Sequence, residues 1–380
     1  MDYFTQRRLA FVKNLKKDGF DALLVTNPVN VTYLTGFTGE ASYLIATAKQ
    51  FILVSDARFE EQIKSEVAGI EVHIRPHTET TPEATAAILT KAAFRSVGVE
   101  GDHVTLGLMA DLQTRAAKVT FAPSPTRVES LRVLKDPVEI ELIRTAVRVA
   151  ERAFNMFRAM LREVDTEKDM VDALESYVRR SGGRGTSFPP IVAVGDRGAL
   201  PHAPPTDRQL GEGSKLLVDW GADCLYKSDI TRTLRSPFGT PPTRRSKQER
   251  VGFNFDEIYE IVCRAQDAAV AVMRPGVPAK EVDAAARKVI ADAGYGEYFT
   301  HGLGHGIGLD IHEAPRIRVN SDDILEHGMV VTIEPGIYIP PGPEGKPPGW
   351  GGIRIEDDFL VTKDGCVRLT TLPRDPGAIG

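Results

Sequence analysis

The chain has 380 residues, of which 42% are hydrophobic and 26% are charged, and its formal net charge is -5. This length exceeds the size at which a single hydrophobic core keeps growing, so two domains are expected. The lack of a basic excess argues against nucleic-acid binding by bulk electrostatics, and no apolar run approaches the ~20 residues of a membrane span.

The N-terminal residues predict an amphipathic surface helix and not a secretion signal. Charged residues interrupt this stretch every few positions, while apolar residues between Leu9 and Leu15 recur close to helical spacing. Cys224, Cys263 and Cys366 are far apart and lack a metal-type pairing, which is typical of a reducing compartment. We therefore expect a cytoplasmic protein.

Short apolar runs of strand length alternate with helical patterns at the start of the chain. They are DALLVTN, YLIAT, QFILVSD and SVGVEG, each bounded by turn residues. This alternation is typical of a sheet covered by helices. The sequence thus predicts an α/β domain over residues 1–132.

A second domain is expected over residues 133–380. Asp136 can cap a helix that has Pro137 at its first position and Glu139 three residues after the cap. Apolar residues follow at three-to-four spacing: Ile140, Ile143, Val147, Ala150 and Phe154.

The second domain contains a weak internal repeat. Segments that start at Ala150 and Ala265 both read as a helix, a turn and a second helix ended by glycine, and each precedes a stretch rich in glycine and histidine. Duplication is the economical explanation, although helical hairpins also look alike by chance. We expect an α/β (α+β) protein whose second domain has two helix-and-sheet halves around a pseudo-twofold axis.

The stretch HGLGHGIGLDIHEAP, residues 301–315, concentrates histidine and glycine. His301 and His305 are four positions apart, as two ligands on a helix would be, but glycine costs roughly 1 kcal/mol in a helix interior. An extended ribbon is the better prediction, and it places both histidines on one face. The bare alternate face lets another backbone or a ligand approach closely.

Four carboxylates stand at strand-like positions. Asp219 ends one apolar strand and Asp229 begins the next, so they read as two arms of a hairpin. Glu334 interrupts an apolar run before a Pro-Gly turn, and the two-residue period puts Glu356 on the same strand face as Arg354. Each carboxylate alone is readily satisfied by a salt bridge or a turn. Together they carry a charge that two divalent cations would neutralise.

One histidine would be a further ligand. An oxygen-rich shell with a single imidazole suits manganese or cobalt, with zinc or iron possible.

Four strings in this order resemble the pita-bread metallopeptidases, in their prolidase and aminopeptidase P branch: DWGADCLYKSDITRT, HGLGHGIGLDIHEAP, TIEPGIY and GGIRIEDD. The N-terminal strings DALLVTNPVNVTYLTGFTGE and VSDARFEEQ resemble the creatinase-type N-terminal domain that accompanies this branch. The resemblance covers nearly the whole chain and implies a pita-bread fold for residues 133–380.

The resemblance implies a role for each matching side chain. Two divalent metal ions would be bound by five residues: Asp219, Asp229, His305, Glu334 and Glu356. Asp229 and Glu356 would bridge the ions. The substrate-side residues would be His301, His312 and His202, of which His301 and His312 hold the scissile carbonyl or its tetrahedral intermediate. Arg354 would support the metal carboxylates.

The implied reaction is hydrolysis of the N-terminal Xaa-Pro peptide bond by a hydroxide that bridges the two ions. Glu334 would carry the proton from the water to the leaving nitrogen. We expect an Xaa-Pro aminopeptidase that acts on small peptides with proline in second position, and a homodimer. The alternatives are an Xaa-Pro dipeptidase, a non-catalytic binding protein on the same scaffold, and a metal-free amidinohydrolase like creatinase.

Three features depart from the family pattern. Asp219 and Asp229 are ten positions apart, one fewer than is usual, so their hairpin must contain a different turn or bulge. The segments 236–254 and 340–350 are long, and we expect the first to be a solvated loop, with a dimer contact or a flap as alternatives. Trp350 would line the substrate entrance or cover a hydrophobic edge.

Overall fold

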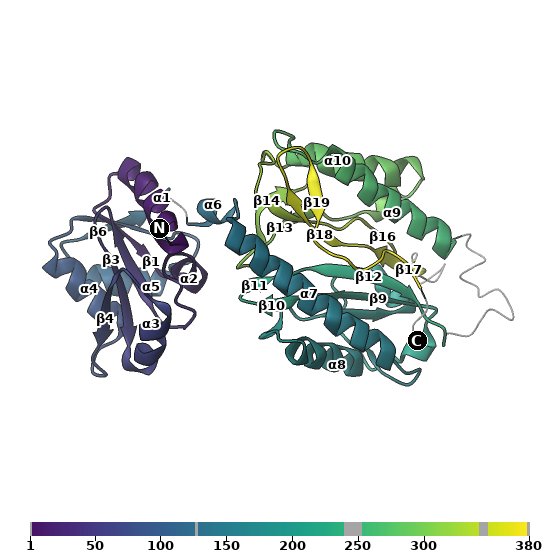
Figure 1. Cartoon of the computed structure of the whole chain (residues 1–380), viewed down its shortest axis with the longest axis horizontal. Helices are drawn as coiled ribbons and strands as arrows, with labels where there is room; N and C mark the ends of the chain where they lie inside the picture. Colours follow the sequence, from purple (N-terminus) through teal and green to yellow (C-terminus); the bar gives the residue numbers. More distant parts are fainter. Residues whose placement is uncertain (1, 126–127, 239–252, 342–348, 378–380) are drawn as a thin grey trace. The chain divides into compact units, whose positions relative to one another are not determined.

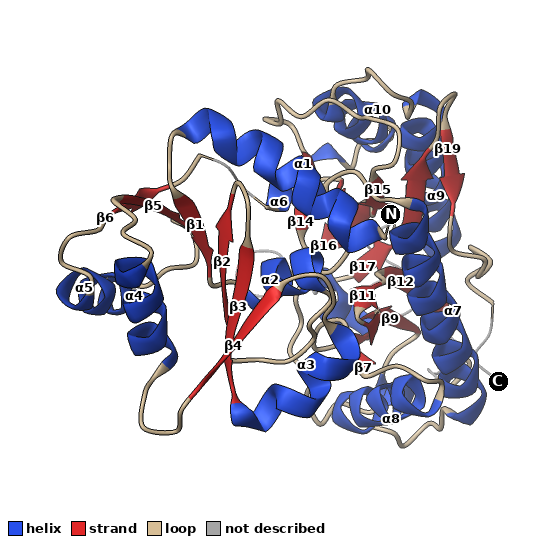
Figure 2. Cartoon of the chain, turned by 60° about the vertical axis from the view of Figure 1, so that its left-hand side comes forward, coloured by secondary structure: helices blue, strands red, loops and turns tan. Residues whose placement is uncertain are grey.

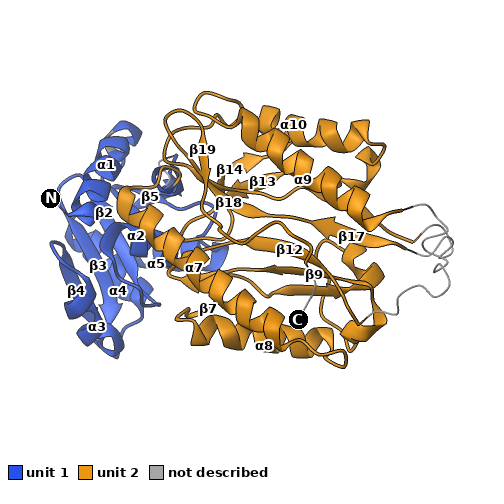
Figure 3. Ribbon diagram, turned by 45° about the vertical axis from the view of Figure 1, so that its right-hand side comes forward, with its two compact units in different colours: residues 1–132 blue, residues 133–380 orange. Residues whose placement is uncertain are grey.

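A computed structural model describes residues 2–125, 128–238, 253–341 and 349–377. The chain divides into two compact units, residues 1–132 (unit 1) and 133–380 (unit 2), shown in separate colours in Figure 3. Within the described residues, no helix is long and apolar enough to cross a membrane.

Unit 1 is a six-stranded sheet with helices on both faces (Figure 2). Its strands are β1 (Ala22–Val25), β2 (Tyr43–Thr47), β3 (Phe51–Asp56), β4 (Glu71–Arg75), β5 (Ser96–Val99) and β6 (Thr120–Pro123). Its helices are α1 (Tyr3–Asp18), α2 (Pro28–Thr35), α3 (Glu60–Glu66), α4 (Thr81–Lys91), α5 (Leu106–Arg115) and α6 (Glu129–Arg132). The strand order is β4-β3-β2-β1-β5-β6, and β1, β5 and β6 run parallel. The four apolar runs predicted as strands are β1, β2, β3 and β5.

Unit 2 begins with the predicted helix. α7 (Pro137–Met160) has Asp136 as its N-cap, whose side chain accepts hydrogen bonds from the amides of Val138 and Glu139. The remaining helices are α8 (Glu167–Arg180), α9 (Phe255–Val272) and α10 (Ala279–Asp292). The α7–α8 and α9–α10 pairs flank the strands of this unit from two sides (Figure 1).

The strands of unit 2 follow each helix pair. After α8 come β7 (Gly185–Thr186), β8 (Ile191–Val194), β9 (Lys215–Trp220), β10 (Ala222–Cys224), β11 (Tyr226–Lys227) and β12 (Ile230–Arg235). After α10 come β13 (Gly304–Gly306), β14 (Glu313–Ile317), β15 (Val330–Ile333), β16 (Gly336–Ile339), β17 (Gly351–Arg354), β18 (Asp357–Val361) and β19 (Cys366–Arg368). The main sheets are β12-β9-β8 and β14-β13-β15-β18-β19.

Each half of unit 2 has its own hydrophobic cluster. In the first half, Trp220 of β9 stacks on Phe154 of α7 with ring centroids 4.1 Å apart. In the second half, α9 packs on β15, β16 and β17 and α10 packs on β14, within a hydrophobic cluster that includes Ile261 and Ile333. An isolated bridge between Thr231 and Glu356 joins the two sheets. The expected pita-bread fold with two helix-and-sheet halves is therefore confirmed.

Most of the two long segments, residues 239–252 and 342–348, lies outside the described residues, so their expected roles stay predictions. Trp350 is described and is 8% exposed. Its ring lies 3.6 Å from Nζ of Lys215 and belongs to the hydrophobic cluster of the second half. This packing favours the alternative in which Trp350 covers a hydrophobic edge.

Candidate metal centre

The hairpin arms bring Asp219 and Asp229 to one face of their sheet. Asp219 on β9 pairs directly with Thr231 on β12, and Asp229 precedes Thr231 by two residues. Paired residues and residues two apart share a face, so all three side chains point the same way.

The shortened connection is accommodated in the β10–β11 hairpin. Cys224 pairs with Tyr226, and the single residue between them, Leu225, adopts a positive φ of 83°. Its amide donates a hydrogen bond to Oδ1 of Asp223 at 2.9 Å. The turn thus absorbs the missing residue without moving Asp219 and Asp229 to opposite faces.

The glycine-rich stretch forms a ribbon only around its central histidine. β13 covers Gly304 to Gly306, whereas the chain at His301 is a bend. A Cβ atom at Gly304 would lie 2.0 Å from the carbonyl oxygen of Thr332, and one at Gly306 would lie 2.1 Å from that of Ala314. The bare face therefore admits neighbouring backbone, and the bulged β13–β14 pairing directs His305 into the site.

The two glutamates lie at strand ends beside this ribbon. Glu334 directly follows β15, and Glu356 lies between β17 and β18. The hydroxyl of Thr231 donates to Oε2 of Glu356 at 2.7 Å and accepts from Nε of Arg354 at 3.1 Å. Arg354 and Glu356 thus meet on one side of the sheet, as the two-residue period predicts.

Side chains from both halves converge on one point. Single ligand atoms of Asp229, His305 and Glu356 lie within 4.8 Å of one another, and all three residues are buried. Nε2 of His305 is 3.6 Å from Oδ2 of Asp229 and 3.5 Å from Oε1 of Glu334. Asp219 lies outside this compact group but on the same sheet face.

His305 faces these carboxylates with a lone pair. Its Nδ1 lies 3.0 Å from the carbonyl oxygen of Gly306, which can only accept, so Nδ1 carries the proton. Burial lowers the pKa of His305 to about 3, so the ring is neutral at ordinary pH. A lone pair aimed at carboxylate oxygens without a proton between them is the arrangement that a cation requires.

The protein places too little positive charge around these carboxylates to neutralise them. Burial and the charges of neighbouring carboxylates raise the pKa of Asp229 and of Glu356 well above their ordinary values. Burial also raises the pKa of Glu334 to about 8. Within the described residues, the buried Oδ1 of Asp219 has no hydrogen-bond partner. An orphaned oxygen, a neutral imidazole and crowded carboxylates fit a pair of divalent cations.

One of the four carboxylates does have an arginine partner. Nη2 of Arg354 lies 2.6 Å from Oδ2 of Asp219, and both side chains are buried. The sequence spacing alone indicated no such ion pair, because the two residues are far apart in the chain. The pair leaves Oδ1 of Asp219 for a metal ion.

Arg354 also begins a chain of hydrogen bonds to His301. Its Nη1 donates to the hydroxyl of Tyr338 at 2.8 Å, and that hydroxyl donates to Nε2 of His301 at 2.8 Å. Nδ1 of His301 lies 2.7 Å from the carbonyl oxygen of Gly302 and donates to it. Both ring nitrogens of His301 are engaged, so a hydrogen bond to a substrate would require one of these contacts to break.

His312 and His202 lie near the same site. The His312 ring meets the His305 ring edge-on, with centroids 4.4 Å apart. His202 is exposed, and its charge is among those that lower the pKa of His301 and of His312. The structure therefore places His202 within electrostatic range of both His301 and His312.

Sequence reasoning missed three neighbours of the site. Thr231 shares the face of Asp229 by the two-residue period, which was an available signal. Tyr338 lies inside the TIEPGIY string, where its hydroxyl stands out in an apolar strand. Arg316 pairs with His305 across the β13–β14 ladder, and its charge helps lower the pKa of His312.

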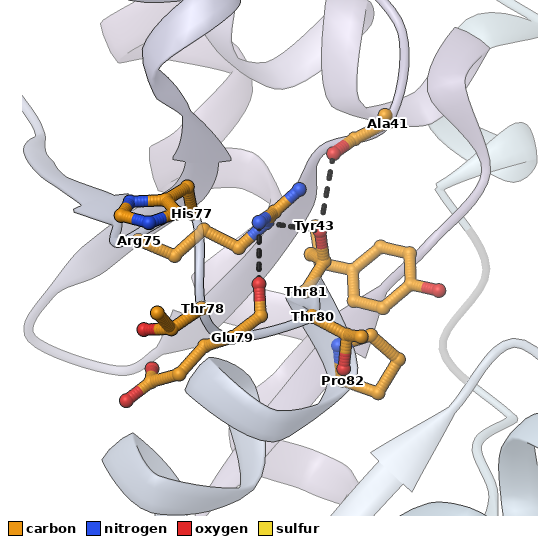
Figure 4. A pocket seen from close by; sticks show the side chains of 9 residues that line it. All are labelled: Ala41, Tyr43, Arg75, His77, Thr78, Glu79, Thr80, Thr81 and Pro82. Atoms are coloured by element: carbon orange, nitrogen blue, oxygen red, sulfur yellow. Dashed lines mark hydrogen bonds between the residues drawn. The ribbon is translucent and has the colours of Figure 1, made fainter.

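Two hollows lie on the surface, one of them beside His301. One of about 370 Å³ is lined by His301, Gly302, Arg287 and Arg318, among others. The other, of about 520 Å³, belongs to unit 1 (Figure 4). There the guanidinium of Arg75 donates to the hydroxyl of Thr81 and to the carbonyl of Glu79. None of the predicted site residues is among those that line this hollow.

Known proteins share both units. Residues 7–134 match the Creatinase/Prolidase N-terminal domain, and residues 141–363 match metallopeptidase family M24. An Xaa-Pro dipeptidase from Pyrococcus horikoshii is 34% identical over 377 residues, which cover 99% of each protein.

Solved structures agree with this match. The Xaa-Pro dipeptidase from Bacillus anthracis is 33% identical with a TM-score of 0.88, and 99% of each chain is covered. An X-Pro aminopeptidase from Thermotoga maritima is also 33% identical, with a TM-score of 0.82 over 96% of this chain and 99% of that one. The present chain is a metallopeptidase that belongs to family M24 and carries a creatinase/prolidase-type N-terminal domain.

Proposed function

We propose that this protein is an Xaa-Pro dipeptidase, a prolidase, that uses two divalent metal ions, with manganese as the expected metal. Relatives named as Xaa-Pro dipeptidases match over nearly the whole chain. The aminopeptidase activity preferred from the sequence has less support, although the similar solved structures include an X-Pro aminopeptidase. A homodimer and a cytoplasmic location stay predictions.

The position of Arg316 is the observation that carries this choice. Arg316 is exposed, lies opposite His305 in the β13–β14 ladder, and acts electrostatically on His312. A dipeptide places its free carboxylate on the proline itself, whereas a longer peptide has a neutral amide at that point. A guanidinium beside the site can bind that carboxylate through two hydrogen bonds and so favours dipeptides.

In this proposal the ions would be held by Asp219, Asp229, His305, Glu334 and Glu356, and Asp229 and Glu356 would each contribute to binding both ions. When bound, the ions polarise the scissile carbonyl and lower the pKa of the attacking water. Glu334 keeps 18% of its side chain exposed, against 7% for Asp229. We therefore assign to Glu334 the transfer of a proton from the water to the proline nitrogen.

The other side chains act on the substrate. His312 and His202 can donate hydrogen bonds to the peptide carbonyl as negative charge develops on its oxygen. We assign His301 a positioning role, because Tyr338 and the Gly302 carbonyl occupy its ring nitrogens. Arg354 holds one oxygen of Asp219 and so orients the other.

The test is hydrolysis of Ala-Pro and of Ala-Pro-Ala by the full-length protein with added manganese, and with a chelator as control. We expect cleavage of the dipeptide to dominate and to stop on metal removal. Cleavage of the tripeptide alone would select the aminopeptidase, and activity that survives complete demetallation would remove the metal mechanism.

Arg316→Ala sharpens the test. We expect kcat/KM for Ala-Pro to fall about tenfold to a hundredfold, mainly through KM, since a charge-assisted pair contributes about 1.5–3 kcal/mol. Lys280→Ala, which removes an exposed cation on α10, is the matched control. Equal losses for Ala-Pro and Ala-Pro-Ala in Arg316→Ala would contradict the carboxylate role.

A further inference from the structure

A fully buried arginine lies behind the strands that carry the acidic ligands. Arg232 on β12 is three residues after Asp229, and 1% of its side chain is exposed. Its Nε donates to the carbonyl of Pro373 at 3.0 Å. Its Nη1 donates to the carbonyls of Thr231 at 2.9 Å and of Glu356 at 2.7 Å.

The remaining guanidinium nitrogen of Arg232, Nη2, also donates hydrogen bonds. Nη2 of Arg232 donates to Oδ1 of Asp357 at 2.7 Å and to the carbonyl of Leu372 at 2.9 Å. Asp357 directly follows Glu356, has 0% exposure, and accepts at Oδ2 from Gln266 at 3.0 Å. All five guanidinium hydrogens thus have an acceptor. A rigid fork of this kind fixes the relative position of every segment that it touches.

These acceptors belong to three different segments of unit 2, namely β12, residues 356–357 and residues 372–373. Residues 371–376, which we call the C-terminal strap, supply the two carbonyls of Leu372 and Pro373. From the opposite direction, Glu151 on α7 accepts from the hydroxyl of Thr371 at 2.7 Å and from the amide of Leu372 at 3.0 Å. The strap is therefore held between the first helix of unit 2 and the ligand strand β12.

The second half of unit 2 also holds the strap. Arg374 donates to Oε1 of Gln266 at 2.8 Å and to Oδ1 of Asp267 at 2.7 Å, both on α9. Gln266 in turn donates to the carbonyl of Ile333, the last residue before Glu334. The strap thus links α7, β12 and α9, which belong to the two different halves.

These contacts matter because the bridging ligands come from different sheets. Asp229 precedes β12, whereas Glu356 precedes β18, and the Thr231–Glu356 bridge joins the two sheets at this point. A small change in the distance between the two sheets would separate two carboxylates that, in the proposed centre, share the same ions. Arg232 binds the carbonyl on each side of the junction.

We infer that Arg232 is a positioning residue for the metal centre, and that the C-terminal strap holds it in place, so that Asp229 and Glu356 keep the separation that shared cations need. This inference rests on the proposed metal centre. Arg232 touches neither ligand carboxylate, and its effect is transmitted through the backbone of Glu356 and through Asp357.

The test compares Arg232→Lys, and a chain that ends after Thr370, with the full-length protein. Manganese bound per chain is measured by equilibrium dialysis over a range of free manganese, and the melting temperature is measured on the same samples. We expect both changes to weaken binding of at least one ion about tenfold or more, as is typical for residues that orient metal ligands.

Arg75→Lys is the matched control. Arg75 is also largely buried and pairs with an aspartate, Asp56, but it belongs to unit 1 and touches no ligand strand. We expect it to lower the melting temperature without changing manganese binding.

The outcomes distinguish a failure of the positioning role of Arg232 from a failure of the proposed metal centre. If the unaltered protein does not bind two ions, the proposed metal centre itself is wrong. If it binds two, and Arg232→Lys binds them equally tightly, the positioning role is overturned while the metal centre stands. Should Arg232→Lys not fold, Asp357→Asn, which retains the hydrogen-bonding carbonyls around Arg232, gives the same test.

Discussion

Buried charge is left uncompensated on one face of the junction between the sheets and is fully compensated on the other. On one face, Asp229, Glu334 and Glu356 crowd around a neutral His305. We call these four residues the acidic cluster. Behind them, the Arg232–Asp357 ion pair is equally buried, and every hydrogen of the guanidinium has an acceptor.

This difference in charge compensation distinguishes an ion pair that stabilises the fold from a cluster that is suited to bind a ligand. A compensated ion pair needs nothing further, since its charges and hydrogen bonds are satisfied within the protein. The acidic cluster holds negative charge that the protein alone does not balance, and the raised pKa of each carboxyl reflects that deficit. A buried cluster that lacks its counter-charge is a candidate binding site for cations.

The largest expected effect comes from breaking the cluster itself. Glu356→Gln removes one carboxylate charge from the cluster but keeps the size of the side chain and its contact with Thr231. We expect the loss of at least one bound ion and a fall in kcat/KM of about a thousandfold or more. Metal content and Ala-Pro hydrolysis are the measurements, with the exposed Glu281→Gln as control. Full activity in Glu356→Gln would show that the cluster is not the metal centre.

Metal removal should make the stability of the protein depend on pH, because it leaves the charge of the acidic cluster uncompensated. Carboxyls whose folded-state pKa is raised bind more protons when folded than when unfolded. The metal-free protein should therefore lose stability as pH rises from about 4, the unfolded value of a carboxyl, to about 8, the folded value of Glu334. Urea unfolding at several pH values, with and without manganese, measures this slope. Bound manganese should flatten it, and identical slopes would contradict the charge deficit.

A smaller effect is expected beside the acidic cluster, where Arg354 compensates the charge of Asp219. Tyr338→Phe removes the hydroxyl between Arg354 and His301 but leaves the Arg354–Asp219 pair. We expect kcat/KM to fall about tenfold, equivalent to ~1.4 kcal/mol, with unchanged metal content. A loss of bound metal would place Tyr338 among the groups that hold the ligands, contrary to our assignment.

The smallest effect concerns the hairpin that aligns Asp219 and Asp229. Leu225→Gly relieves a positive φ that a side chain disfavours, and we expect the free energy of unfolding to rise by about 0.5 kcal/mol. Leu225→Ala, which keeps the unfavourable φ, should give no such gain. Chemical denaturation distinguishes the two, and a change in metal binding would show that the side chain of Leu225 supports the ligands directly.

Much of this organisation could be predicted from local signals. The cap at Asp136, the alternation of the first unit and the repeated helix pair each depend on neighbouring residues, and each is present in the structure. Asp229 and Glu356 could be predicted as partners in one site because an acidic residue in an apolar strand needs a partner. His305 was distinguished from the neighbouring histidines only by the resemblance to the metallopeptidase family.

The remaining contacts join residues that are far apart in the chain. Arg354 meets Asp219 and Arg232 meets the C-terminal strap because two sheets converge, and no period in the sequence encodes that convergence. The proposed preference for dipeptides likewise rests on Arg316, whose place opposite His305 appears only in the folded structure.

The sequence by itself determined which carboxylates are candidates to hold cations, because carboxylates in apolar strands are costly unless they are neutralised. Only the tertiary structure decided which of their charges were already compensated, since an ion pair forms through space between segments whose meeting depends on the packing of the whole unit.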